Sequence, residues 1–276
     1  MRNYADVHEA YEQGRFHQYE IRKVSGACGG QLSFDLSYSG GLPLPNYYAT
    51  APLEMAVLNG DRGIYKGKGS GKKYIHKICA LTLNTNLATS TLTLYDYIAY
   101  VPFIDLDSTD EQTIATIELP RYKDGVGLRV MAVSQGAGVN NTNLTMTYIN
   151  QDGVEKSATT RLDALNAGAG TVICTGTYNS ISHKYLKFSQ GDYGIRSIVK
   201  VRSDTAVGAI CSLVIVKPLC SINLMEYATP MEVDFLIDRG HLIEVHDDAY
   251  INMVMFNNSV YQQIPSYHGY VNLIWE

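Results

Sequence analysis

The sequence predicts an all-β protein: a β-sandwich or jelly-roll-like antiparallel body with an extended N-terminal arm and at most short helices. Three observations predict this class. Apolar and polar side chains alternate in many segments, most plainly over 91–105, as a half-buried strand requires. Clusters of Gly, Pro, Asn and Asp bound these segments, and the spacing of the candidate strands is typical of a sandwich.

The N-terminal part, 1–50, is expected to form an arm and an extended segment. Tyr4, Val7 and Tyr11 fall at helical spacing, but so short a helix requires tertiary contacts to be stable. The prolines of the loop 39–46 favour an extended path. Because such an arm would lie across a neighbouring subunit, Tyr4, Val7 and Tyr11 are candidate contact residues.

The main β-sandwich is expected over 51–222, and 223–276 adds about four strands, either as a small subdomain or as closing strands of the same sandwich. The segment 150–153, Asn-Gln-Asp-Gly, has the composition of a hairpin turn. The segment 108–111 has a Ser-x-x-Glu capping-box pattern, which predicts one short helix. The candidate strands lie near 31–38, 53–58, 73–83, 91–101, 126–134, 143–149, 154–160, 171–177, 193–202, 207–217, 231–237 and 249–256.

Few charged residues and many tyrosines indicate a surface that partners cover. The chain has 46% hydrophobic and 18% charged residues, whereas about 25% of residues are charged in an average soluble domain. Its 21 Tyr suit interfaces, since tyrosine combines apolar area with a hydroxyl. Cross-strand packing explains them equally well. Under the interface interpretation Tyr95, Tyr97 and Tyr100 are further candidate contact residues.

Composition also bears on partners and compartment. A net charge of −5, with Lys and Arg scattered, is unlike a nucleic-acid-binding surface. The sequence shows neither a signal peptide nor the ~18 apolar residues of a membrane span, so we expect synthesis in a cytoplasm and no membrane partner. The five cysteines include no Cys-x-x-Cys pair, which predicts free thiols, of which Cys28 should be the most exposed.

One acidic turn invites chemical interpretations. Asp105, Asp107 and Thr109 match the Asp-x-Asp-x-Thr motif of haloacid-dehalogenase-type phosphatases, in which the first Asp attacks phosphorus. The surrounding sequence lacks the alternating strands and helices that this chemistry requires. A candidate Ca²⁺ site consists of Asp105, Asp107, Asp110 and Glu111. A solvated turn explains these carboxylates more simply, so we expect no catalytic residues, no cofactor and no bound metal.

Five further segments carry no chemistry but share a pattern with known proteins. They are YDYIAYVPFIDLDSTDEQ (95–112), LPRYKDGVGLR (119–129), QGDYGIRS (190–197), VIVKPL (214–219) and VNLIW (271–275). In these segments the sequence resembles a group of tailed-bacteriophage virion structural proteins. The resemblance covers most of residues 50–276 and leaves 1–49 outside it.

The resemblance implies a non-enzymatic protein of the virion, made in the host bacterial cytoplasm. As a head decoration or cement subunit, it would contact the major capsid protein or other virion proteins and would form a homo-oligomer. The alternative in the same setting is a tail or fibre component that contacts a host glycan or other tail proteins.

Overall fold

A computed structural model describes residues 3–26, 32–60, 62–67, 69–83, 89–174, 184–257 and 265–276. As the sequence predicts, the fold is all-β, and the helices of the described residues are short: α1 (Tyr4–Glu12), α2 (Phe235–Arg239) and the 3-10 turn η1 (Leu36–Tyr38). No helix in these ranges has the length and apolar character that a membrane span needs. The strands are β1 (Phe16–Val24), β2 (Ser33–Asp35), β3 (Gly41–Leu42), β4 (Ala56–Val57), β5 (Lys73–Thr82), β6 (Ser90–Asp105), β7 (Gln112–Thr113), β8 (Arg129–Ser134), β9 (Thr142–Asn150), β10 (Glu155–Leu162), β11 (Thr171–Val172), β12 (Ile195–Ser203), β13 (Ile210–Leu224), β14 (Met231–Asp234), β15 (Ile243–Val245), β16 (Tyr250–Asn257) and β17 (Ser266–Trp275).

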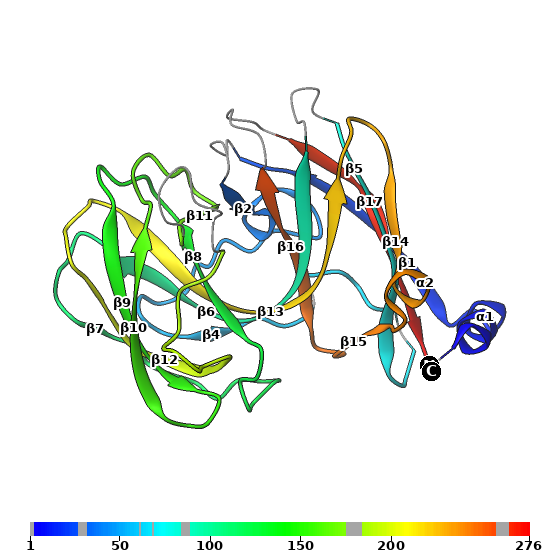
Figure 1. The fold of residues 1–276 in the computed structure, drawn as a ribbon, viewed down its shortest axis with the longest axis horizontal. Coiled ribbons are helices and arrows are strands. Elements are labelled where there is room, and N and C mark those ends of the chain that lie inside the picture. The colour runs from blue at the N-terminus through cyan, green and yellow to red at the C-terminus, as the bar shows by residue number, and fades with distance from the viewer. Residues whose placement is uncertain are drawn as a thin grey trace.

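These strands form three sheets whose ladders are antiparallel (Figure 1). The six-stranded sheet has the order β14-β5-β17-β1-β3, with β15 also paired to β5. The four-stranded sheet has the order β10-β9-β12-β7. In the third sheet β13, β8, β11, β2, β16 and β6 follow one another, and pairing of β6 with β13 closes the ring.

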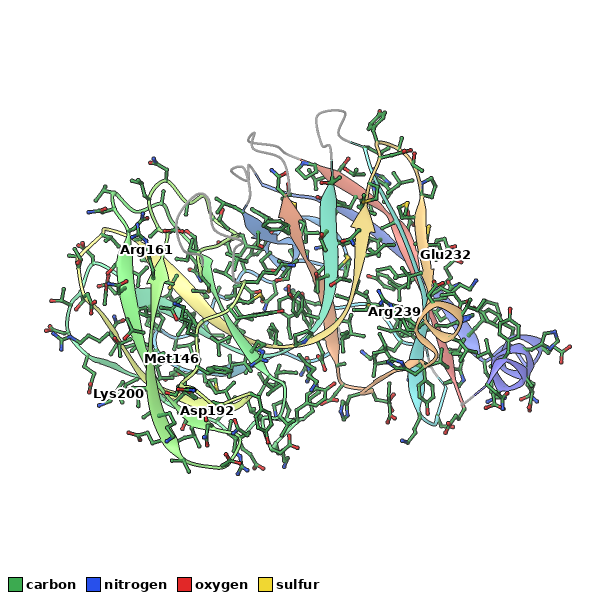
Figure 2. All side chains as sticks on the ribbon, in the orientation of Figure 1. Met146, Arg161, Asp192, Lys200, Glu232 and Arg239 are labelled. Carbon is green, nitrogen blue, oxygen red and sulfur yellow. The ribbon has the colours of Figure 1, made fainter. Side chains whose placement is uncertain are left out.

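Two long strands, β6 and β13, join two lobes. They pair from Ser90 and Leu224 at one end to Asp105 and Ile210 at the other. In the first lobe, on the left of Figure 1, β8 and β13 lie with the four-stranded sheet around a core that includes Met131. In the second lobe β16 and β6 face the six-stranded sheet across another core. Side chains fill both interiors (Figure 2). Because β6 and β13 contribute to both cores and pair with each other, with register shifts at three places, the lobes are parts of one folded body.

Strand β6 is buried on both faces, which corrects the expectation of a half-buried strand. Its polar members Thr93 and Asp96 are buried, as are the apolar residues beside them. Each has a partner inside the protein: Thr93 Oγ1 lies 2.9 Å from Ser221 Oγ, and Asp96 is bound by Arg121. The polar side chains of the alternating pattern therefore form hydrogen bonds inside the protein. They do not indicate a solvent-exposed face of the strand.

The segment expected as a free arm lies within the chain's own sheet. Strand β1 pairs along its whole length with β17. Helix α1 packs Val7 and Ala10 against Tyr74 and Ile274 of the sheet, and these are the tertiary contacts that a short helix needs. The six-stranded sheet thus contains strands from each of the three expected parts of the chain, 1–50, 51–222 and 223–276. The boundaries at 50 and 222 stay a prediction, because strand pairing does not show which ranges fold alone.

The helix expected from the 108–111 pattern is absent, and a turn takes its place. Asp105 Oδ1 accepts a hydrogen bond from the Asp107 amide at 2.8 Å, and Asp107 Oδ1 accepts one from the Gly208 amide at 2.9 Å. Ser108 Oγ accepts from the Asp110 amide at 3.2 Å. Such side-chain bonds to the backbone compete with helix formation, which is why the capping-box pattern was misleading here.

Two other local signals had different outcomes. The hairpin predicted at 150–153 is confirmed: it joins β9 to β10, and Gly153 adopts a φ of +78° that favours glycine.

The strand predicted over 231–237 ends at Asp234. There the Asp234 carboxylate accepts hydrogen bonds from the amides of Leu236 and Ile237, both at 3.1 Å, and caps α2.

Candidate functional site

The tyrosines proposed as contact residues on β6 are interior residues. Tyr95 and Tyr97 are fully buried, and Tyr100 is nearly so, because β6 is covered on both faces. Their interpretation as contact residues is therefore corrected in favour of packing. Of the N-terminal candidates, Val7 is buried between α1 and the sheet, whereas Tyr4 is 58% exposed.

Two buried tyrosines, Tyr97 of β6 and Tyr48, converge on one carboxylate, that of Asp35 at the end of β2. Asp35 accepts hydrogen bonds from the phenol of Tyr97 at 2.7 Å, from the phenol of Tyr48 and from the amide of Ser37 at 2.9 Å. Burial raises the pKa of Asp35 above its ordinary value. The pKa values of both phenols are also raised, chiefly by burial and secondarily by the carboxylate. This network holds η1 and the chain after it against β6.

The segment that follows, 42–47, presents apolar side chains to the outside. Leu42, Leu44 and Tyr47 are 37%, 48% and 51% exposed. The ring of Tyr47 packs edge-on against Tyr38, with 5.4 Å between ring centroids. The segment begins at β3, an edge strand of the six-stranded sheet. The signal in the sequence was the alternation Leu42-Pro43-Leu44-Pro45, whose prolines predicted an extended path but not exposure.

The backbone of the 42–47 segment is held in place from two sides. The Tyr250 hydroxyl of β16 donates to the Leu44 carbonyl at 3.1 Å. The Asn46 amide donates to the Ser37 carbonyl at 2.7 Å. Exposed apolar residues on an ordered backbone make a surface that loses little conformational entropy when a partner covers it.

The acidic turn does not gather its carboxylates into a metal site. Asp105 and Asp107 are occupied by backbone amides, and Glu111 pairs with Lys200 at 2.9 Å. Across the described residues there is no group of three or more His, Cys, Asp or Glu placed to hold a metal ion. The aspartates also follow a strand of an antiparallel sheet, which is not the parallel-sheet context of the phosphatase motif.

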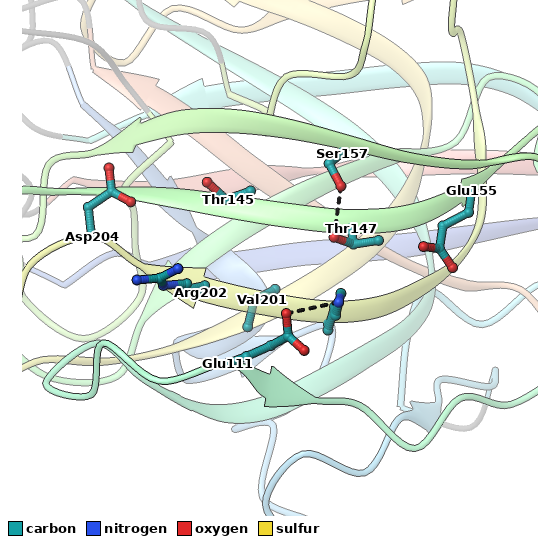
Figure 3. A pocket seen from close by; sticks show the side chains of 9 residues that line it. Glu111, Thr145, Thr147, Glu155, Ser157, Val201, Arg202 and Asp204 are labelled. Carbon is teal, nitrogen blue, oxygen red and sulfur yellow. Dashed lines mark hydrogen bonds and ion pairs between the residues drawn. The ribbon is translucent and has the colours of Figure 1, made fainter.

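The outer face of the four-stranded sheet carries a shallow polar hollow of about 330 Å³ (Figure 3). Hydroxyls on neighbouring strands bond each other across its floor, with Thr147 Oγ1 2.8 Å from Ser157 Oγ. At its edge Glu111 pairs with Lys200. None of its lining side chains has a buried polar atom without a partner, so no buried group in the hollow calls for a ligand.

A second cleft, of about 510 Å³, contains two buried ammonium groups. Lys66 Nζ donates to the Ala249 carbonyl at 2.6 Å. Lys73 Nζ donates to the Gly67 carbonyl at 3.1 Å and pairs with Asp247 at 3.0 Å. Both lysines therefore bind the chain itself and hold the segment before β5 against the turn before β16.

The cysteines differ in their surroundings. Cys174 and Cys211 are buried, and burial raises the pKa of Cys174 to about 12. Cys79 and Cys220 are partly exposed. The reactivity predicted for Cys28 stays a prediction, because this residue lies outside the described ranges.

Fold and surface together define an all-β protein of two joined lobes with an ordered, exposed apolar segment. No protein-family model matches the chain, and no curated protein matches it. Among solved structures, the chain is similar to "Structure of infectious bursal disease virus Gt strain" (11% identity, 94% of this chain and 80% of that chain, TM-score 0.18). It is also similar to "Crystal structure of infectious bursal disease virus VP2 subviral particle" (7% identity, 95% and 82%, TM-score 0.16). At these TM-scores neither likeness carries an argument about fold or function.

Proposed function

We propose that this chain is a non-enzymatic structural subunit of a virus particle and, within that class, a head decoration or cement subunit. Its partners would be the major capsid protein or other virion proteins, together with copies of itself. The observation that supports the proposal most is the ordered apolar 42–47 segment. The buried centre of a protein interface is more apolar than the rest of the surface and is enriched in tyrosine. The resemblance of five segments to phage structural proteins favours the same class.

The shape of the body supports this role. A cement subunit bridges its neighbours and must transmit force between contacts without deforming. Because β6 and β13 extend through both lobes and pair from Ser90 to Asp105, with register shifts along the way, strain on one lobe reaches the other through the paired strands. A stable interface of the usual size, about 1,600 Å², is larger than the 42–47 segment alone, so neighbouring loops would also take part.

A tail or fibre component that contacts a host glycan is the second candidate. It is favoured by a groove of about 340 Å³ that Tyr4 and Tyr11 of α1 line together with Tyr270 and Asn272 of β17. The Asp-dependent phosphatase is the least favoured alternative, since backbone amides already bind the Asp105 and Asp107 side chains.

The test is cryo-electron microscopy of virus particles from the host that produces this chain, with co-sedimentation of the purified protein. We expect a regular array over the capsid. Leu44→Asp should weaken co-sedimentation at least tenfold, because it places a charge in the interface. Val139→Asp is the matched control, since Val139 is 79% exposed and lies in the first lobe.

Other outcomes would contradict the proposal. Density confined to the tail would favour the second candidate. Absence from every particle would remove the virion role and reopen the question of an enzyme. Equal co-sedimentation of Leu44→Asp and wild type would show that the 42–47 segment is not the contact.

A further inference from the structure

A groove of about 340 Å³ lies between α1 and the outer face of the six-stranded sheet. Tyr4 and Tyr11 of α1 form one wall. The floor comes from three strands that are far apart in sequence: His76 on β5, Glu232 on β14, and Tyr270 with Asn272 on β17. Figure 2 places Glu232 on the outer side of this sheet.

The floor has hydrogen-bonding capacity that the protein does not use. The side-chain oxygen of Asn272 is buried and has no hydrogen-bond partner. His76 is almost fully buried; its Nδ1 lies 3.0 Å from the Tyr11 hydroxyl. Its Nε2 lies 3.2 Å from Asp234 Oδ2, yet the two atoms do not make a well-directed hydrogen bond. Unpaired buried polar atoms cost free energy, and a ligand that donates hydrogen bonds would recover it.

The charges of the groove disfavour an anionic ligand. Glu232 and Asp234 both pair with one cation, Lys77, at 3.2 Å each. Burial lowers the pKa of His76, so this ring is neutral at neutral pH and adds no positive charge. The Glu232 carboxylate also accepts a hydrogen bond from the Tyr270 hydroxyl at 2.5 Å, which lowers the pKa of Glu232 and keeps it ionised.

The groove also offers aromatic surface. Tyr4 is 58% exposed, and the rings of Tyr11 and Tyr270 line the same hollow. A ligand that suits the groove combines an apolar face with hydrogen-bond donors and carries no negative charge. The volume is within the ~300–1,000 Å³ range of small-molecule sites.

We propose that this groove binds a neutral sugar residue, with the C–H face of the sugar ring against Tyr4 and Tyr270 and its hydroxyls donating to Asn272 and Glu232. A pyranose has the required combination of one apolar face and a rim of hydroxyl donors. The site goes beyond the structural role proposed above and does not depend on it. It would let a subunit of a particle hold a glycan without any catalytic step.

The test uses the full chain and ligand-observed saturation-transfer NMR with glucose, galactose, mannose, N-acetylglucosamine and N-acetylneuraminic acid. At least one neutral sugar should receive saturation, and the acidic sugar should receive none. Tyr4→Ala should weaken binding of the neutral sugar about tenfold, as loss of an aromatic anchor does. Tyr193→Ala is the matched control, since Tyr193 is also about half exposed but lies in the first lobe.

Three results would overturn the proposal: no saturation of any neutral sugar, equal binding by Tyr4→Ala and wild type, or equal binding of the acidic sugar. Binding of a lysine-rich peptide without any sugar would also overturn it, in favour of a protein partner. The Leu44→Asp variant should bind sugar as the wild type does. The proposed sugar site and the proposed capsid contact can thus be refuted independently of each other.

Discussion

The carboxylate of Asp96 on β6 and the guanidinium of Arg121 form a buried ion pair. The pair lies near the point where the edge of β6 stops pairing with β16 and begins to pair with β4. Arg121 Nε donates to Asp96 Oδ2 at 2.7 Å. The remaining donors of Arg121 bind the carbonyls of Leu58 at 3.0 Å and Tyr97 at 2.7 Å. The Asp96 carboxylate also accepts from the Tyr250 amide at 3.1 Å. One ion pair thus ties the 114–128 loop to β6, β16 and the chain after β4.

Removal of the cation should be costly. Arg121→Met leaves the Asp96 carboxylate buried without its partner, and the free energy of unfolding should fall by about 3–5 kcal/mol, as measured by urea denaturation. The control is Lys123→Met, whose pair with Glu118 at 2.7 Å is exposed and should contribute less than about 1 kcal/mol. If both variants show the same small loss of unfolding free energy, the buried ion pair does not stabilise the fold.

Lys23 should make stability depend on pH. It is fully buried, and burial lowers its pKa from 10.5 to about 8. Below pH 8 both the folded and unfolded chains hold the proton, and the folded state bears the full cost of the buried charge. Between about pH 8 and 10.5 only the unfolded chain holds it, so the contribution of Lys23 to the unfolding free energy rises with pH.

The variant Lys23→Met isolates this contribution. Urea denaturation at pH 8, 9 and 10 should show the wild type gaining stability relative to the variant, by on the order of 3 kcal/mol over the full interval. The quantity to compare is the difference in unfolding free energy between wild type and variant. Buried thiols such as Cys174 lower the stability of both proteins above pH 9, and the difference removes this contribution. A constant difference between pH 8 and 10 would refute the assignment.

The thiols should react in the order of their burial. Iodoacetamide at pH 8 should alkylate the partly exposed Cys79 long before Cys174 and Cys211, because a buried thiol is both inaccessible and poorly ionised. Mass spectrometry of native and urea-unfolded samples measures the order. Unfolding should abolish the difference, and equal native rates would contradict the burial of Cys174.

Gly269 should be intolerant of a side chain. A Cβ atom there would lie 2.0 Å from the Cys79 carbonyl oxygen of the paired strand β5, so Gly269→Ala should cost about 1–3 kcal/mol through displaced backbone. Thermal denaturation measures the loss. Gly136→Ala, which faces open space, is the control and should change stability little. Similar melting temperatures for the two variants would show that the β5–β17 ladder adjusts freely.

The sequence named Tyr4, Val7 and Tyr11 as contact residues, and all three line the groove beside α1, but it did not show which strands lie opposite them. The groove beside α1 joins side chains from 4–11, 76–77, 232–234 and 270–272, and no local motif connects segments so distant. The 42–47 segment was recognisable as an extended, proline-containing loop. Its exposure, however, follows from the position of β3 at a sheet edge, which only the pairing of β1 reveals.

The sequence by itself determined what short-range physics controls: the all-β class, most of the strands, the turn at 150–153 and the helical spacing of Tyr4, Val7 and Tyr11. Only the tertiary structure decided that β6 is buried on both faces, that β1 belongs to the sheet, and that the acidic turn binds backbone amides. The physical reason is that alternation specifies two faces of a strand but not what covers them. Burial depends on partners such as Arg121 and Ser221, which the chain brings to β6 from far along its length.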